Sequence, residues 1–186
     1  MQMDFVLQCL ECNPIIAAVQ RDSLQEAIDS PAQIIFHLSA DLMSVADIVD
    51  AVHRAGKLIF IHLDLAEGLG KDRTAVRYLS KCGVDGIIST KTQLIRYAKE
   101  CGLVTVQRFF ALDSKGMDSI EDMLRSSSPH FMEIMPGVIG KAIRRFQNCG
   151  IPVIAGGLIE TKSEVTEALS CGATAVSTGK TNLWML

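Results

Sequence analysis

One pattern dominates this sequence: a short apolar run, a polar turn, an amphipathic stretch with helical spacing, and a glycine that leads into the next apolar run. The glycines Gly56, Gly83, Gly102, Gly150 and Gly172 each follow a helix-like stretch, and glycine commonly ends a helix there in a left-handed conformation. These glycines are 27, 19, 48 and 22 residues apart, and 48 is about twice 24. The chain therefore repeats a strand-and-helix unit of about 23 residues.

The unit occurs eight times. Predicted strands lie at 15–19, 33–37, 57–64, 84–89, 104–109, 131–135, 152–155 and 174–178. Predicted helices lie near 23–30, 44–55, 72–82, 92–101, 119–125, 138–149 and 163–171. Strict alternation predicts a parallel sheet buried on both faces. Eight units favour a compact TIM-like (β/α)8 barrel. An open doubly wound sheet is the alternative, and no Gly-x-Gly-x-x-Gly follows the first strand to support it.

The eight units use nearly all of the 186 residues, so we expect a single barrel domain over residues 1–186. Only Gly179 to Leu186 follow the last strand, which leaves room for a stunted last helix. Part of the apolar barrel wall should then be exposed. We expect the segment 4–12, or a second subunit of a homo-oligomer, to cover it.

Composition excludes several classes of protein. Hydrophobic residues make up 48 % of the chain and charged residues 21 %, with a net charge of −3. The chain is too apolar for intrinsic disorder and too balanced in charge to coat a polyanion. No apolar run reaches the roughly 18–20 residues of a membrane span, and no basic segment opens a signal peptide. We expect a cytoplasmic protein without a membrane partner.

The six cysteines do not form a disulfide pattern. Four of them directly precede a glycine at a predicted helix end, where we expect small buried apolar residues: Cys82, Cys101, Cys149 and Cys171. Cys9 and Cys12 form a lone Cys-x-x-Cys. A metal or redox role needs a second ligand pair or a strand-to-helix context. We therefore interpret Cys9 and Cys12 as residues on two turns of an amphipathic helix, and we predict no metal site.

The last two strands end in a pattern typical of phosphate binding. Gly156 and Gly157 follow the seventh strand, and Ser177, Thr178 and Gly179 end the eighth. Glycines let backbone N–H groups approach an oxyanion, and a short segment after Gly179 can present a helix N-terminus to it. Barrels often bind phosphate at this position. The alternative is that these glycines only form tight turns.

His62, Asp64 and Glu67 end the third strand. Alternation along a strand places His62 and Asp64 on one face. A carboxylate accepts two hydrogen bonds from a diol, so polyol binding is one interpretation. A hard cation and a purely structural role are the others.

Glu133 lies inside an apolar strand, and a buried charge is rarely left without a partner. We expect Glu133 to face the barrel mouth and to meet Arg108, Lys91 or a ligand hydroxyl. Arg108 ends the fifth strand and Lys91 follows the fourth. Both can bind a ligand anion or form an ordinary ion pair.

Lys141, Arg144 and Arg145 share one face of a predicted helix and could meet an RNA backbone. Such a cluster is more often a solvated face, and the chain has no RNA-recognition fingerprint.

Several segments, in order, together resemble the glycerol-3-phosphate-responsive antiterminator family, regulators of glycerol uptake operons in bacteria. They are Asn-Pro-Ile-Ile-Ala-Ala-Val at 13–19, His-Leu-Asp-Leu-Ala-Glu-Gly-Leu at 62–69, Met-Pro-Gly at 135–137, Ile-Ala-Gly-Gly-Leu-Ile at 154–159, Ala-Val-Ser-Thr at 175–178 and Asn-Leu-Trp at 182–184. The resemblance implies a TIM-like barrel that binds glycerol 3-phosphate and acts on leader mRNA to cause antitermination. It also implies that Gly156, Gly157, Ser177 and Thr178 hold the phosphate and that His62, Asp64, Glu67 and Glu133 hold the glycerol. The family often has a second serine where Gly179 stands.

Two other functions stay open. One is a small barrel enzyme, an isomerase, aldolase or phosphodiesterase, acting on a phosphorylated triose or polyol. A Schiff-base aldolase needs a lysine near the mouth, and Lys57 begins its strand at the opposite end. The other is a sensor of glycerol 3-phosphate that contacts protein rather than RNA. We predict a non-enzymatic regulator that needs no cofactor, with glycerol 3-phosphate as its regulatory ligand.

Overall fold

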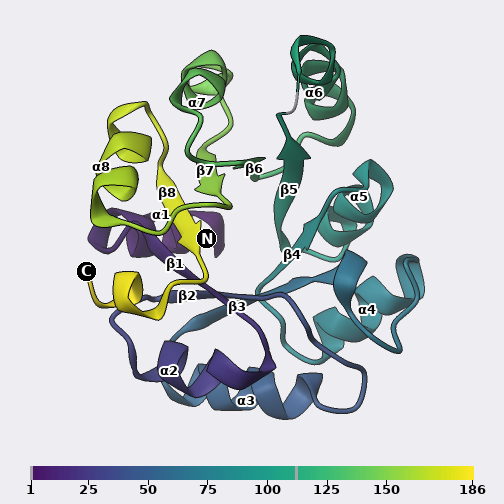
Figure 1. Cartoon of the computed structure of the whole chain (residues 1–186). Coiled ribbons are helices and arrows are strands. Elements are labelled where there is room, and N and C mark those ends of the chain that lie inside the picture. Colours follow the sequence, from purple (N-terminus) through teal and green to yellow (C-terminus); the bar gives the residue numbers. More distant parts are fainter. Residues whose placement is uncertain (1, 112) are drawn as a thin grey trace.

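The computed structural model describes residues 2–111 and 113–186, and its strands close into an eight-stranded parallel barrel (Figure 1). Each strand pairs with the next along the chain, and the last pairs with the first, where Ile15 lies opposite Val176. The predicted barrel is therefore confirmed, and the open sheet is excluded because no strand is left at an edge.

The strands are β1 Ile15–Val19, β2 Ile34–His37, β3 Leu58–His62, β4 Gly86–Ser89, β5 Val104–Phe110, β6 Phe131–Met135, β7 Val153–Gly156 and β8 Ala175–Thr178. The helices are α1 Gln2–Cys12, α2 Leu24–Asp29, α3 Val45–Arg54, α4 Arg73–Lys81, α5 Thr92–Glu100, α6 Ser114–Ser127, α7 Gly140–Phe146 and α8 Lys162–Ser170. Short 3-10 helices are η1 Arg21–Ser23, η2 Leu63–Leu65 and η3 Thr181–Met185. The stunted last helix is confirmed as η3.

Local sequence explains most helix ends. The five glycines that end helix-like stretches all have positive φ, between +73° at Gly56 and +102° at Gly172. Helix α8 begins with a capping box in which the Thr161 side chain accepts from the Glu164 N–H while the Glu164 side chain binds the Thr161 N–H. Helix α6 begins earlier than predicted because the Asp113 side chain caps it by accepting from the Gly116 N–H.

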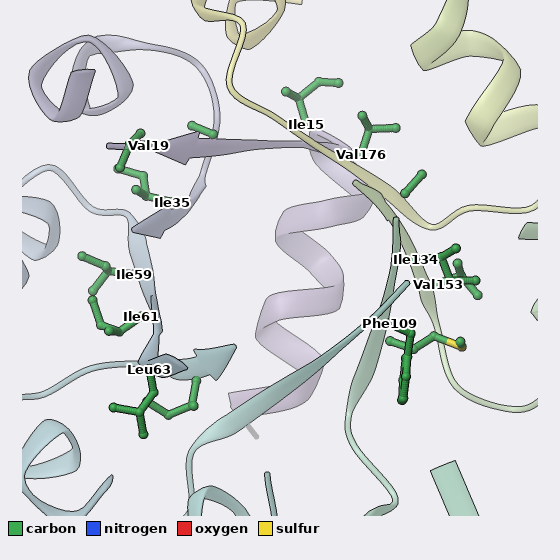
Figure 2. Close-up of a cluster of buried hydrophobic side chains, with 14 of the residues drawn as sticks. Ile15, Val19, Ile35, Ile59, Ile61, Leu63, Phe109, Ile134, Val153 and Val176 are labelled. Carbon is green, nitrogen blue, oxygen red and sulfur yellow. The ribbon is translucent and has the colours of Figure 1, made fainter. Parts of the chain in front are cut away.

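Alternating residues of each strand form two apolar layers. Ile15, Val19 and Val176 are among the buried residues of the outer layer, which packs against the helices. Figure 2 shows these labelled side chains on the outside of the ring of strands. The outer layer explains the near-continuous apolar runs, because strands covered on both faces need apolar residues at every position.

The inner layer fills the barrel with large side chains. Ile16, Phe36, Phe60 and Phe131 are buried there, and the Phe36 and Phe60 ring centroids are 5.4 Å apart. Gly86 is required beside them, since a Cβ at that position would lie 2.3 Å from the Phe60 ring. The barrel interior is thus a packed core below its mouth.

Helix α1 lies where we did not expect it. The prediction that segment 4–12 covers the outer wall was wrong, because Val6, Cys9 and Leu10 pack with the inner layer. Helix α1 therefore closes the barrel end from which the strands start, and Figure 2 shows it crossing the ring of strands. The outer wall beside β1 and β8 is covered instead by η3, whose Trp184 is buried and donates through Nε1 to the Thr178 carbonyl at 2.7 Å.

The cysteine prediction is only partly confirmed. All six are free thiols, and Cys9 and Cys12 lie on a helix as interpreted. Of the four that precede glycine, Cys171 is buried, Cys82 and Cys101 are half-buried, and Cys149 is exposed. Cys149 lies beyond the end of α7, which is shorter than predicted. Among the described residues, no helix is both long and apolar enough to span a membrane.

Replacing Leu10 by Ala should lower the free energy of unfolding by about 2–5 kcal/mol, because it removes a buried side chain of α1, the helix that closes one end of the barrel. Urea denaturation measures this change. Phe5→Ala on the same helix is the matched control: Phe5 is 51 % exposed, and its loss should cost less than about 0.5 kcal/mol. Equal effects of the two substitutions would contradict the packing of α1 inside the barrel.

Candidate functional site

A pocket of about 400 Å³ opens at the barrel mouth, where the strands end. Its walls come from the ends of β1, β2 and β5 to β8 and from the loops that follow them. The lining residues are Ala18, Gln20, Asp22, Ser23, Leu38, Arg108, Glu133, Met135, Gly157, Leu158, Ile159, Ser177, Thr178 and Gly179. The structure thus brings together six residues singled out from the sequence: Arg108, Glu133, Gly157, Ser177, Thr178 and Gly179.

Glu133 is the centre of this site. Its side chain is fully buried, and both carboxylate oxygens accept hydrogen bonds. Oε2 accepts from Arg108 Nε at 2.6 Å, and Oε1 accepts from Ser177 Oγ at 2.6 Å. The register of β5 and β6 sets up the ion pair, because Arg108 lies directly opposite Glu133. Glu133 therefore holds Arg108 and Ser177 in place.

Gly156 makes room for this carboxylate. A Cβ at Gly156 would lie 2.3 Å from Glu133 Oε1 and 3.0 Å from Ser177 Oγ. Gly156 is thus needed for the buried pair and does not itself line the pocket. Gly157 does line it, with a φ of +76° that favours glycine.

Arg108 keeps unused hydrogen-bonding capacity. Its side chain is 9 % exposed, and its Nε donates to Glu133. Within the described residues, the structure shows no other hydrogen bond from the guanidinium. A guanidinium has five N–H donors, so Arg108 can still bind an anion or hydroxyl groups in the pocket.

His62 lies buried beside this network, and its Nδ1 has no hydrogen-bond partner among the residues that the structure describes. Burial, followed by the positive charge of Arg108, lowers the pKa of His62 to about 4, against the opposing effect of Asp64 and Glu133. His62 is therefore neutral at neutral pH, and its imidazole carries one donor and one acceptor.

Asp64 ties two loops together. It lies in η2 just beyond β3, and it accepts from Ser89 Oγ at 2.6 Å and from the Thr90 N–H and Thr90 Oγ1 at 2.7 Å. Burial raises the pKa of Asp64, but these hydrogen bonds outweigh burial and lower it. The Asp64 carboxylate thus fastens the loop after β3 to the loop after β4.

Five residues predicted to bind the ligand do not line the pocket: Gly156, His62, Asp64, Glu67 and Lys91. Glu67 is exposed, and its backbone forms a bridge with Asp41. Lys91 is exposed at the start of α5. Among residues 2–111 and 113–186, no three His, Cys, Asp or Glu side chains are grouped so that they could hold a metal ion.

The end of β8 is held by its own hydrogen bonds. Thr178 Oγ1 donates to the Ile159 carbonyl at 2.7 Å and accepts from the Lys180 N–H at 3.1 Å. Lys180 also pairs with Glu160 at 3.1 Å, which joins the loops after β7 and β8. The segment after Gly179 is the five-residue 3-10 helix η3, so any helix-end contribution to anion binding is small.

The sequence prediction omitted the contribution of the first two strands. Gln20, Asp22, Ser23 and Leu38 follow β1 and β2 and line the pocket. The signal for them was available, because polar residues directly after a strand end lie at the same edge as those after the other strands.

The basic cluster on α7 is partly neutralised. Lys141 and Arg144 are exposed. Arg145 turns towards α6, where it pairs with Asp118 at 2.6 Å and Glu121 at 3.0 Å.

Comparisons with known proteins identify the family of this chain. A family model described as "Glycerol-3-phosphate responsive antiterminator" matches residues 15–184. The chain is 36 % identical to an uncharacterized Escherichia coli K12 protein, YgcP, over 97 % of this chain and 96 % of that one. A crystal structure of a glycerol uptake operon antiterminator regulatory protein from Listeria monocytogenes has a TM-score of 0.88 at 31 % identity, over 92 % of this chain and 95 % of that one. A glycerol uptake operon antiterminator-related protein from Thermotoga maritima has a TM-score of 0.84 at 33 % identity, over 92 % and 98 %.

Burial of neutral His62 predicts a pH-dependent stability. The unfolded chain takes up this proton near pH 6.5 and the folded chain only near 4, so the unfolded state binds more protons between these values. The contribution of His62 to the free energy of unfolding should fall by about 2 kcal/mol between pH 7.5 and 5.0. Urea denaturation at both pH values measures it. His62→Gln should reduce the pH dependence by that amount, and an unchanged dependence would contradict the assignment.

Glu133→Gln should lower the free energy of unfolding by about 3–5 kcal/mol, because Arg108 would remain buried without a counter-charge. The exposed pair between Arg73 and Glu100 provides the control, and Glu100→Gln should cost at most about 1 kcal/mol. Thermal or urea unfolding distinguishes the two. Similar losses in both variants would show that the Glu133 pair is no more important than a surface pair.

Proposed function

Because the chain belongs to the glycerol-3-phosphate responsive antiterminator family, we propose that it is a cytoplasmic regulatory protein that binds glycerol 3-phosphate in the mouth pocket and acts on leader mRNA. In this proposal, ligand binding causes antitermination of transcription in genes of glycerol uptake and metabolism.

The observation that carries the proposal is the arrangement of Arg108, Ser177 and Gly179 around one small pocket. A volume of about 400 Å³ is in the range of small-ligand sites. Gly179 of the last loop lines the pocket, and Arg108 offers N–H donors that Glu133 holds in place. A phosphate monoester requires convergent donors of this kind.

We assign the two ends of the ligand to different walls. The phosphate would lie against Gly157, Gly179 and the guanidinium of Arg108, where backbone and side-chain N–H groups can donate. The glycerol hydroxyls would face Gln20 and Asp22, whose oxygens can accept. In this assignment, Glu133 positions Arg108 rather than contacting the hydroxyls, and Asp64 supports the loops.

The enzyme alternative has less support from the described residues. Lys57 Nζ donates to the carbonyls of Ala27, Ser30 and Ala32 at the closed end of the barrel. It is therefore far from the mouth and engaged with backbone. We propose a regulator that needs no cofactor, and turnover of triose phosphates would argue for the enzyme instead.

Gly179→Asp should weaken glycerol 3-phosphate binding at least about ten-fold, because it brings a second negative charge to the phosphate. Calorimetric titration measures the affinity. Gly179→Asn is the matched control, since its side chain has nearly the size of Asp without the charge, and it should lose much less affinity than Gly179→Asp.

Titration with glycerol provides the second comparison. The wild type should bind glycerol 3-phosphate much more tightly than glycerol. Equal affinities would refute the phosphate site. Gel shifts of the leader transcript of the protein's own operon, with and without ligand, would test the RNA step separately.

A further inference from the structure

The charge of this protein is distributed unevenly along the chain. Residues 71–100 contain seven Lys or Arg and three Asp or Glu, whereas the other 156 residues contain eleven and eighteen. A segment with a net charge of +4 thus lies in a chain whose net charge is −3. This segment contains α4, β4 and α5, and β4 has no charged residue. All but one of the charges therefore lie on the two helices or just before them, and the exception is Asp85, which directly precedes β4.

The two helices present these charges on one outer face. Arg73, Arg77 and Lys81 follow one another at four-residue spacing, so they form a row along α4. Arg96 is exposed on α5, and Lys91 is exposed where α5 begins. Figure 1 shows α4 and α5 as neighbours on the outside of the barrel, and they pack against each other.

Contacts between the helices hold the face together. The Arg73 guanidinium lies over the Tyr97 ring, 5.7 Å from its centroid, and pairs with Glu100 at 2.7 Å. At the mouth end, Asp64 binds Thr90, which directly precedes Lys91. The charged groups therefore lie on a fixed surface. At its mouth end, this surface is linked to the strand ends through the contact between Asp64 and Thr90.

Most cations on this face have no acidic partner. Within the described residues, the side chains of Arg77, Lys81, Lys91 and Arg96 form no hydrogen bond or ion pair. By contrast, Arg125 and Arg145 on α6 and α7 pair with carboxylates of α6. Exposed cations held without counter-charges raise the local potential and attract a polyanion.

We propose that the outer face of α4 and α5, defined by Arg73, Arg77, Lys81, Lys91 and Arg96, is the surface that contacts the phosphate backbone of the leader RNA. The identity of the polyanion rests on the function proposed above, whereas the position of the surface rests on charge and geometry. Lys and Arg side chains bind phosphates without reading bases, so this face would supply affinity and orientation rather than sequence specificity.

The test is a salt titration of RNA binding with two matched double variants. Arg77→Glu with Lys81→Glu reverses two exposed charges on α4, and Lys141→Glu with Arg144→Glu makes the same change on α7. The probe is a labelled transcript of the leader of the protein's own operon, with glycerol 3-phosphate present. The α4 variant should bind at least ten-fold more weakly, and the slope of log affinity against log salt should fall by roughly 1.5, since each lost phosphate contact removes about 0.7–0.9. The α7 variant should bind as the wild type does.

Calorimetry with glycerol 3-phosphate accompanies each variant and should give wild-type affinity, which shows that the barrel is folded. Loss of RNA binding in the α7 variant alone, or equal binding by all three proteins, would overturn the assignment of the surface while the proposed function stands. A wild-type protein that binds ligand but shifts no leader transcript would overturn both the RNA step and this surface, and would favour a protein partner.

Discussion

The buried pair of Glu133 and Arg108 is the interaction on which the mouth of this barrel depends. A carboxylate without solvent exposure must be matched by a charge and hydrogen bonds, and here Arg108 and Ser177 supply them. The same contacts fix the side chains that line the pocket. Three strand ends, those of β5, β6 and β8, are thereby joined by side chains in addition to the sheet. The cluster of Glu133, Arg108 and Ser177 therefore contributes to the stability of the barrel and also fixes the shape of the site.

Two glycines that do not end helices are explained by the packing of side chains inside the barrel. Gly86 gives space to the Phe60 ring, and Gly156 gives space to the Glu133 carboxylate. A small barrel has a fixed internal volume, so a large side chain on one strand requires a small one opposite. Gly156 was interpreted from the sequence as part of a phosphate loop. Its neighbours show that its immediate steric role is to accommodate a charge.

The barrel could be predicted from the sequence because strict alternation of strands and helices, with five helix-ending glycines, can be recognised locally. Eight such units in a row favour one fold, the closed barrel. Arg108 was one of the three partners expected for Glu133, since a charge inside an apolar strand requires a partner. The placement of α1 was not predictable, because an amphipathic segment shows one apolar face and does not say which apolar surface it covers. Asp64 and Glu67 were grouped with His62 by sequence spacing. Asp64 stays close enough to His62 to affect its pKa, but η2 turns the chain after His62, and Glu67 is exposed.

The packed core below the mouth, to which α1 adds side chains at the far end of the barrel, has a kinetic consequence. The barrel is open only at its mouth, so a molecule in the mouth pocket enters and leaves past the same rim of strand ends and loops. Any partner that covers this rim therefore slows arrival and departure together. Such a partner would lengthen the residence time of the ligand without changing a single contact in the pocket. The residence time of a molecule bound in this pocket is thus set by what lies over the rim as well as by affinity.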